Sequence, residues 1–168
     1  MKRIILILAA LILLLIGCAP SAPPPTAQPT FDFIFRYGVG AKNELDTFEG
    51  TYTKDMVLDP SVTIKLSLTE EEMNQIQQKM TEISFFDYPE VFSVAVPPGE
   101  PVGSITPFAS YYFKVQQGSI TKELKWDAEI VNKDAKADKL KELIKLITDI
   151  IQSKPEYQKL PPPNGGYL

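Results

Sequence analysis

The stretch that decides the fold is Tyr111-Tyr-Phe-Lys-Val-Gln-Gln-Gly-Ser-Ile-Thr-Lys-Glu-Leu-Lys-Trp126, which predicts a β-hairpin with one apolar face. Apolar and polar residues alternate on both sides of Gln117-Gly118, and this period of two is typical of half-buried strands. A two-residue turn at Gln117-Gly118 sets the register, which pairs Val115 with Ile120, Phe113 with Lys122, and Tyr111 with Leu124. All these residues and Trp126 share one face, on which Lys122 is the only misfit.

Three more strands are predicted before the hairpin. Residues 31–37 place four aromatic rings on one face, those of Phe31, Phe33, Phe35 and Tyr37. Residues 48–56 form the second strand, with Phe48, Tyr52 and Met56 on one side, and residues 62–68 alternate as the third. Gly38-Val39-Gly40 interrupts the first strand. Because it lacks a third glycine and a following helix start, it predicts a turn and not a phosphate-binding loop.

Two amphipathic helices complete the set. Thr69 and Glu72 form a capping box, and the apolar stripe after them predicts a helix that ends near Ile83. Residues 137–153 predict the second helix, which Pro155 stops. Its apolar stripe consists of Leu140, Leu143, Ile144, Ile147 and Ile151.

These elements predict a single α+β domain over residues 31–168, with an irregular C-terminal tail. We expect a small antiparallel sheet of about five strands, with both helices packed on one face. Residues 89–107 contain Pro97, Pro98, Gly99 and Pro101 and predict a long connection. Connections of this length inside a domain are commonly functional or mobile.

The first 17 residues predict a secretory signal peptide. Lys2 and Arg3 precede thirteen uninterrupted apolar residues, Ile4 to Ile16, which are followed by Gly17-Cys18. A helix of that run spans roughly 20 Å at 1.5 Å per residue, which is short of the ~30 Å hydrocarbon core. The run is therefore too short for a permanent membrane span.

Leu15-Ile16-Gly17-Cys18 resembles the lipobox of bacterial lipoprotein precursors. The resemblance implies that the Cys18 thiol receives a diacylglyceryl group and that the chain is cut before Cys18. Acyl chains such as palmitate would then anchor the mature chain outside the cytoplasm, on the cell membrane or on an outer membrane if the organism has one. The alternatives are an uncleaved signal anchor and a secreted protein with a chance cysteine.

Residues 18–30 predict a lipidated cysteine followed by a tether. Five of the twelve residues from Ala19 to Thr30 are proline, which favours extended polyproline II over helix or sheet. At ~3.1 Å per residue, this stretch could reach roughly 35 Å. We therefore expect the folded domain to stand off the membrane.

Composition excludes several functions. The chain has no histidine and one cysteine, so neither a Ser-His-Asp triad nor a Cys-His pair can form. Without Lys2 and Arg3 the chain carries 15 basic and 21 acidic residues, which argues against nucleic acid as a partner. We expect no cofactor and no metal site.

The remaining candidate chemistry has simpler structural explanations. Ser119 and Lys122 match the S-x-x-K spacing of penicillin-binding proteins, but that chemistry needs a helix start and these residues lie on a hairpin. The acidic run 70–72 is typical of a helix N-terminus. The remaining acids, in the connection before the last helix, lack EF-hand spacing; they are Asp127, Glu129, Asp134 and Asp138. Tyr112 is predicted to lie on the polar hairpin face.

The predicted function is therefore that of a membrane-anchored lipoprotein whose domain binds a protein or cell-wall partner. The expected contact surfaces are residues 89–107 and the exposed hairpin face. A carboxylate-dependent hydrolase acting on envelope glycans and a carrier of small apolar ligands are the alternatives. The folded part also resembles small bacterial lipoproteins through residues 53–55, 85–89 and 97–101, a resemblance that implies no activity.

Overall fold

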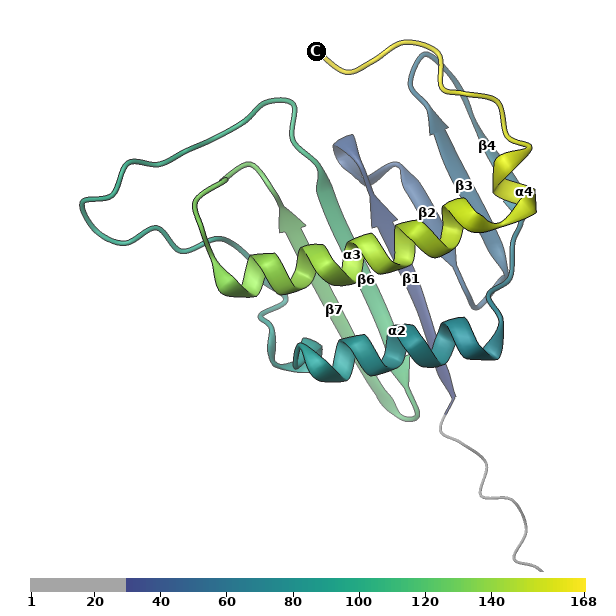
Figure 1. The fold of residues 1–168 in the computed structure, drawn as a ribbon, viewed down its shortest axis with the longest axis horizontal. Helices are drawn as coiled ribbons and strands as arrows, with labels where there is room; N and C mark the ends of the chain where they lie inside the picture. The colour runs from purple at the N-terminus through teal and green to yellow at the C-terminus, as the bar shows by residue number, and fades with distance from the viewer. Residues whose placement is uncertain (1–29) are drawn as a thin grey trace, which may run out of the picture.

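Seven strands form one mixed sheet in the computed structural model, which describes residues 30–168 (Figure 1). The predicted signal peptide, Cys18 and most of the tether lie outside these residues. The sheet order is β4-β3-β2-β1-β6-β7-β5, and neighbours are antiparallel except for β5 and β7. The strands are β1 (Phe31–Tyr37), β2 (Asn43–Asp46), β3 (Thr51–Met56), β4 (Asp59–Lys65), β5 (Val91–Phe92), β6 (Ser110–Gln117) and β7 (Ile120–Asp127).

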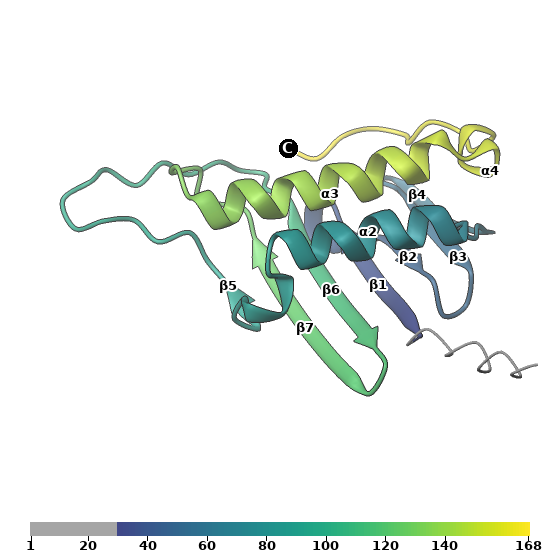
Figure 2. The same ribbon diagram turned by 60° about the horizontal axis from the view of Figure 1, so that its bottom comes forward.

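Helices α2 (Glu70–Glu82) and α3 (Ala135–Ser153) cover the same face of this sheet (Figures 1 and 2). A short α4 (Pro155–Gln158) follows α3, and the 3-10 turns are η2 (Val39–Ala41) and η3 (Phe85–Asp87). The α+β class and the packing of two main helices on one face are confirmed. The predicted purely antiparallel sheet is wrong, because β5 runs parallel to β7.

The core lies between the sheet and the two helices. Phe35 of β1 stacks on Phe113 of β6 with 4.7 Å between ring centroids, and Phe85 meets the edge of Phe113 at 5.3 Å. Leu140 and Leu143 of α3 are fully buried above them. Burial of these side chains is the main driving force, at about 25 cal/mol per Å² of apolar surface.

The hairpin forms, but its predicted register is wrong by two residues. The two-residue turn is Gly118-Ser119, and Gly118 adopts a positive φ of 58° that suits glycine. This register pairs Phe113 with Leu124 and Tyr111 with Trp126, so that apolar residues face each other across the hairpin. Because the shift is an even number, every side chain keeps its predicted face.

Lys122, the one misfit on the apolar face, has a partner. Val115 lies opposite it, and its ammonium group donates a hydrogen bond to the carbonyl of Tyr88, which follows η3. Ile120 was predicted to lie on the apolar face, but it is 60% exposed at the turn end of the hairpin. The apolar face is therefore buried only where the helices cover it.

Two strands were missed. The predicted strand 48–56 corresponds to β3 alone, which begins at Thr51. β2 precedes it and was not predicted, and the turn that joins β2 to β3 contains Phe48, which is 42% exposed. β2 carries one buried residue, Leu45, and so shows no periodicity. β5 has two residues inside the predicted loop 89–107 and depends on pairing with Lys125 and Trp126, far along the chain.

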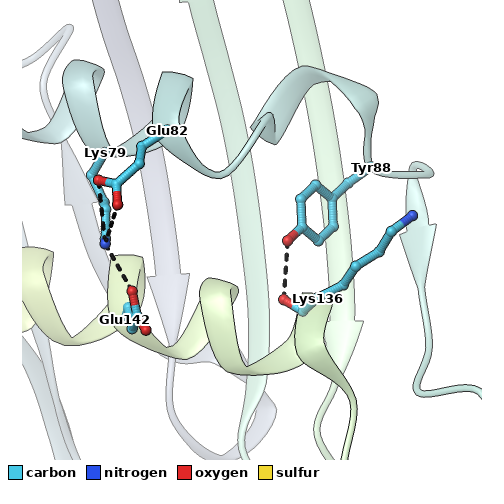
Figure 3. A network of polar contacts seen from close by, with 5 residues as sticks. All are labelled: Lys79, Glu82, Tyr88, Lys136 and Glu142. Carbon is cyan, nitrogen blue, oxygen red and sulfur yellow. Dashed lines mark hydrogen bonds and ion pairs between the residues drawn. The ribbon is translucent and has the colours of Figure 1, made fainter.

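Polar contacts join α2 and α3 along their length. The predicted capping box is confirmed: Glu72 N–H donates to Thr69 Oγ1, and Thr69 N–H donates to Glu72 Oε2. The ammonium of Lys154, just after α3, also donates to Glu72. Lys79 of α2 pairs with Glu142 of α3 at 2.8 Å (Figure 3). The two helices therefore run antiparallel.

We predict that Phe113→Ala lowers the free energy of unfolding by about 3–5 kcal/mol, because it leaves a cavity among packed aromatic rings. Urea denaturation of the full chain measures this. Ile120→Ala, on the exposed end of the same hairpin, is the control and should change stability by less than about 0.5 kcal/mol. A Phe113→Ala effect as small as that of the control would contradict the described core.

We predict a pH-dependent contribution from Glu72. Burial raises the pKa of this carboxyl, but the hydrogen bonds from Lys154 and from the Thr69 amide outweigh burial, so the pKa lies below its usual value. The contribution of Glu72 to folding stability is fully present above the pKa of its carboxyl in the unfolded chain, about 4.3. It is lost as the pH falls through the lower pKa that the carboxyl has in the folded chain.

Glu72→Gln should therefore lower the free energy of unfolding by about 1–2 kcal/mol at pH 7, the size of a hydrogen bond to a charged group. The difference from the unsubstituted chain should shrink towards zero below about pH 4. Glu71→Gln, one residue earlier in the same helical turn, is the matched control. A Glu72→Gln effect that is independent of pH would exclude this role of the ion pair.

Candidate functional site

The sheet face opposite α2 and α3 is the candidate functional surface (Figure 2). Strand side chains alternate between faces, so the residues between the buried ones point to this side. On the adjacent strands β1, β6 and β7 these residues are polar with one exception, Ile34. They are Asp32 and Arg36 of β1, Ser110, Tyr112, Lys114 and Gln116 of β6, and Thr121, Glu123, Lys125 and Asp127 of β7.

A hollow of about 490 Å³ lies on this surface. We call it the Arg36 hollow. Its walls come from the last part of β1, the turn η2, the start of β6 and the end of β7. It is lined by Arg36, Gly40, Ala41, Ser110, Tyr111, Tyr112, Glu123, Lys125 and Asp127. Its volume falls within the ~300–1,000 Å³ typical of small-molecule sites, although it is shallow and open.

Arg36 is fixed in place by its two neighbouring strands. The sheet register sets it opposite Glu44 of β2 and Tyr112 of β6. Arg36 Nε donates to the Glu44 carboxylate, and the guanidinium carbon lies 5.5 Å from the centre of the Tyr112 ring. A guanidinium has five N–H donors, so this ion pair leaves the Nη donors for another acceptor.

The far wall of the hollow is held by Ser110 and Asp127. Ser110 Oγ donates to the Asp127 carboxylate at 2.5 Å, and Ser110 N–H donates to Gly38 O at 2.9 Å. Gly38 has φ 93°, and a Cβ there would lie 2.8 Å from the Asn43 amide, so glycine is required. Ala41 in the same turn has φ 53°, which is strained for a residue with a side chain. The predicted turn at 38–40 is thus confirmed, and Gly40 and Ala41 of this segment line the hollow.

The prediction that Tyr112 points to the polar face is confirmed. Burial raises the pKa of the Tyr112 phenol, and the nearby Glu123 carboxylate raises it further. Tyr112 therefore stays neutral at pH 7, and its hydroxyl can both donate and accept a hydrogen bond.

The loop 93–107, within the predicted contact segment 89–107, extends from one end of the domain (Figure 1). Asn132 holds it from both sides of its amide: Oδ1 accepts from Gly103 N–H at 2.8 Å, and Nδ2 donates to Pro101 O at 2.9 Å. Val102 and Ile105 on the loop are 62% and 49% exposed. The loop is therefore an ordered protrusion with apolar side chains in solvent.

A second, smaller hollow of about 290 Å³ lies between η3 and the start of α3. Tyr88 hydroxyl donates to Lys136 O at 3.0 Å, and the Lys136 ammonium lies 5.8 Å from the Tyr88 ring centre (Figure 3). Burial raises the pKa of Tyr88, and Asp134 raises it further. These contacts join η3 to α3 and so serve the packing of the helical layer.

The other predicted candidates are placed apart from the Arg36 hollow. Ser119 lies in the hairpin turn, while the ammonium of Lys122 is bound to Tyr88 O, so the S-x-x-K pair is not assembled. Glu72 belongs to the α2 cap, and Asp134 caps α3 by accepting from the amides of residues 136 and 137. Of the four acids predicted to precede the last helix, Asp127 is the end of β7 and alone lines the hollow.

The aromatic residues on the predicted apolar strand faces are core residues. Phe33, Phe35, Phe113 and Trp126 are buried, and Phe31 is half-buried against them. Among residues 30–168, no three carboxylate, histidine or cysteine side chains lie close enough together to hold a metal ion. In the same part of the chain, no helix combines the length and apolarity that crossing a bilayer requires.

Comparison with known proteins supplies no relative. No model of a known protein family matches the chain, and a search of curated proteins found no match. The functional assignment therefore depends on the residues and their geometry.

Sequence reasoning identified the exposed hairpin face but missed the role of Arg36. Residues 36 and 112 meet only because β1 pairs with β6, and 75 residues separate them along the chain. The local signal around Arg36 is the alternation of residues 31–37, which places it on the polar face.

We predict that Asn132→Ala releases the loop 93–107 without unfolding the domain. The change removes both side-chain bonds to residues 101 and 103. The backbone bonds of Gly103 and Ile105 to residues 131 and 129 remain, so the part of the loop before Gly103 should open at low free-energy cost. Limited proteolysis should cut the loop at least about fivefold faster, with global stability lowered by about 1 kcal/mol or less. Lys133→Ala is the control, and equal cleavage of both variants would rule out the clamp.

Proposed function

We propose that this chain is a membrane-anchored extracytoplasmic lipoprotein, held by lipid on Cys18, whose folded domain is a binding module. The observation that carries the binding role is the Arg36 hollow on the uncovered sheet face. Soluble antiparallel sheets often expose one face. This face differs from a simple solvated surface because charged, aromatic and hydroxyl groups surround one recess.

The position of the recess supports this role. Thr30 O accepts from Gly118 N–H at 2.8 Å, so the preceding tether joins the domain beside the hairpin turn. Arg36 lies six residues after Thr30, about 20 Å away at 3.4 Å per residue. A lipid anchor on the tether would therefore leave the Arg36 hollow at the end of the sheet away from the attachment point.

The geometry favours binding over hydrolysis. Glu123 and Asp127 both line the hollow, but they lie four positions apart on β7, which places their Cα atoms about 13 Å apart. Paired glycosidase carboxylates lie ~5–10 Å apart across the reacting bond. The Asp127 carboxylate is also engaged by Ser110.

The carrier alternative has less support. A small-ligand carrier requires an apolar cavity of roughly 300 Å³ or more. In residues 30–168 the layer between sheet and helices is packed with fully buried side chains such as Phe33, Phe113, Leu140 and Ile147. The hollows described above are open and partly polar.

The anchor is tested with Cys18→Ala. We expect uncleaved precursor that no longer incorporates labelled fatty acid, because the substituted residue lacks the thiol that carries the lipid. Membrane fractionation and labelling of cells measure both effects. Continued lipid labelling of this variant would overturn the assignment of Cys18.

The binding face is tested by photo-crosslinking in cells. The full chain carries p-benzoylphenylalanine in place of Lys125 at the Arg36 hollow, or in place of Lys145, which is exposed on α3. We expect adducts from position 125 and far fewer from position 145. Equal adducts from both positions, or none from position 125 in correctly anchored protein, would contradict this binding face.

A further inference from the structure

The ligand class of the Arg36 hollow follows from its charge and its hydrogen-bonding groups. Two cations, Arg36 and Lys125, and two anions, Glu123 and Asp127, line it, so the lining carries no net charge. Glu44 at the rim is already paired with Arg36. A polyanion would meet two carboxylates and a polycation would meet two cations, so neither is favoured.

The available groups are evenly divided between donors and acceptors. The Nη groups of Arg36 and the ammonium of Lys125 donate, and the carboxylate of Glu123 accepts. The Asp127 carboxylate accepts from Ser110 and keeps lone pairs for a further donor, and the hydroxyl of Tyr112 both donates and accepts. A ligand that satisfies such a set must itself offer donors and acceptors side by side. Neutral hydroxyl groups meet this requirement, because each can donate to a carboxylate and accept from a cation.

The hollow also contains an aromatic surface on a rigid support. Tyr112 is held between Arg36 on β1 and Lys125 on β7 by the sheet register. Arg36 is fixed by Glu44 and Ser110 by Asp127, so the polar groups are positioned before a ligand arrives. Sites on strands keep their geometry better than sites on loops. The C–H face of a sugar ring packs on an aromatic side chain through apolar contact.

We propose that the Arg36 hollow binds a neutral, polyhydroxylated glycan chain. This inference rests on the proposed binding role of the same face and specifies its ligand. Arg36 and Glu123 carry the recognition, as donor and acceptor on opposite sides of Tyr112. The recess holds a short saccharide segment, and the open ends of the sheet face leave room for a longer chain to continue.

The test is isothermal titration calorimetry on the full chain in detergent micelles. The probe is a neutral tetrasaccharide of β-1,4-linked N-acetylglucosamine, and the comparison ligands are a heparin tetrasaccharide and spermine. We expect the neutral probe to bind with a dissociation constant of roughly 1 mM or tighter, a modest affinity suited to an open site. The two charged ligands should bind at least about tenfold more weakly.

Two variants localise the binding. Arg36→Met keeps the aliphatic stem and removes the donors, and Glu123→Gln keeps the shape and removes the charged acceptor. Each variant should raise the dissociation constant for the neutral probe at least about tenfold, which corresponds to a loss of roughly 1.4 kcal/mol of binding free energy. Lys65→Ala, on β4 of the same sheet face, is the matched control and should change binding less than twofold.

The inference is overturned if the unsubstituted chain does not bind the neutral probe, if heparin or spermine binds more tightly, or if the two variants bind like Lys65→Ala. Protein adducts from position 125 together with absent glycan binding would reject this ligand and leave the binding face in place. Absence of both would reject the binding face as well.

Discussion

The structure depends on burial of one face of the central strands. Phe33 and Phe35 of β1 and Phe113 and Val115 of β6 are removed from water by α2 and α3. With no disulfide available from a single cysteine, packing and hydrogen bonding must hold the domain together. The helices cover only this face, so the opposite face keeps its polar side chains and can carry function.

The helical layer is positioned by contacts that sequence patterns do not show. Glu72 caps α2 and binds Lys154 after α3, Lys79 of α2 reaches Glu142, and Tyr88 beyond η3 reaches the first turn of α3. These contacts fix the two helices antiparallel above the aromatic core. The carbonyl of Tyr88 also accepts a hydrogen bond from Lys122, which allows a lysine on the buried face of β7.

Local patterns predicted the elements whose residues alternate or recur strongly. The aromatic repeat of 31–37, the capping box at Thr69 and Glu72, and the apolar stripe of the last helix are all found. β2 was not predicted because Leu45 is its only buried residue. β5 was not predicted because a parallel strand of two residues is recognised only through its pairing with β7. The predicted hairpin register was wrong by two residues. A shift by an even number of residues keeps every side chain on the same face, so the alternation could not distinguish a turn at Gln117-Gly118 from one at Gly118-Ser119.

The same limit applies to the site. The polar face of the hairpin could be predicted from alternation within 111–126. The meeting of Arg36 and Tyr112 could not, since it depends on pairing between distant strands. The proposed lipid anchor at Cys18 belongs to residues outside those described, and it depends on the residue pattern alone.

The central claim is that the sheet is covered on one face and open on the other. The most direct measurement is a cysteine scan of positions 112 to 116 in β6, with maleimide labelling of the full chain in membranes isolated from cells. Alternating reactivity is predicted, with fast labelling at 114 and 116 and protection at 113 and 115. Uniform labelling along the strand, or protection at all five positions, would contradict the account.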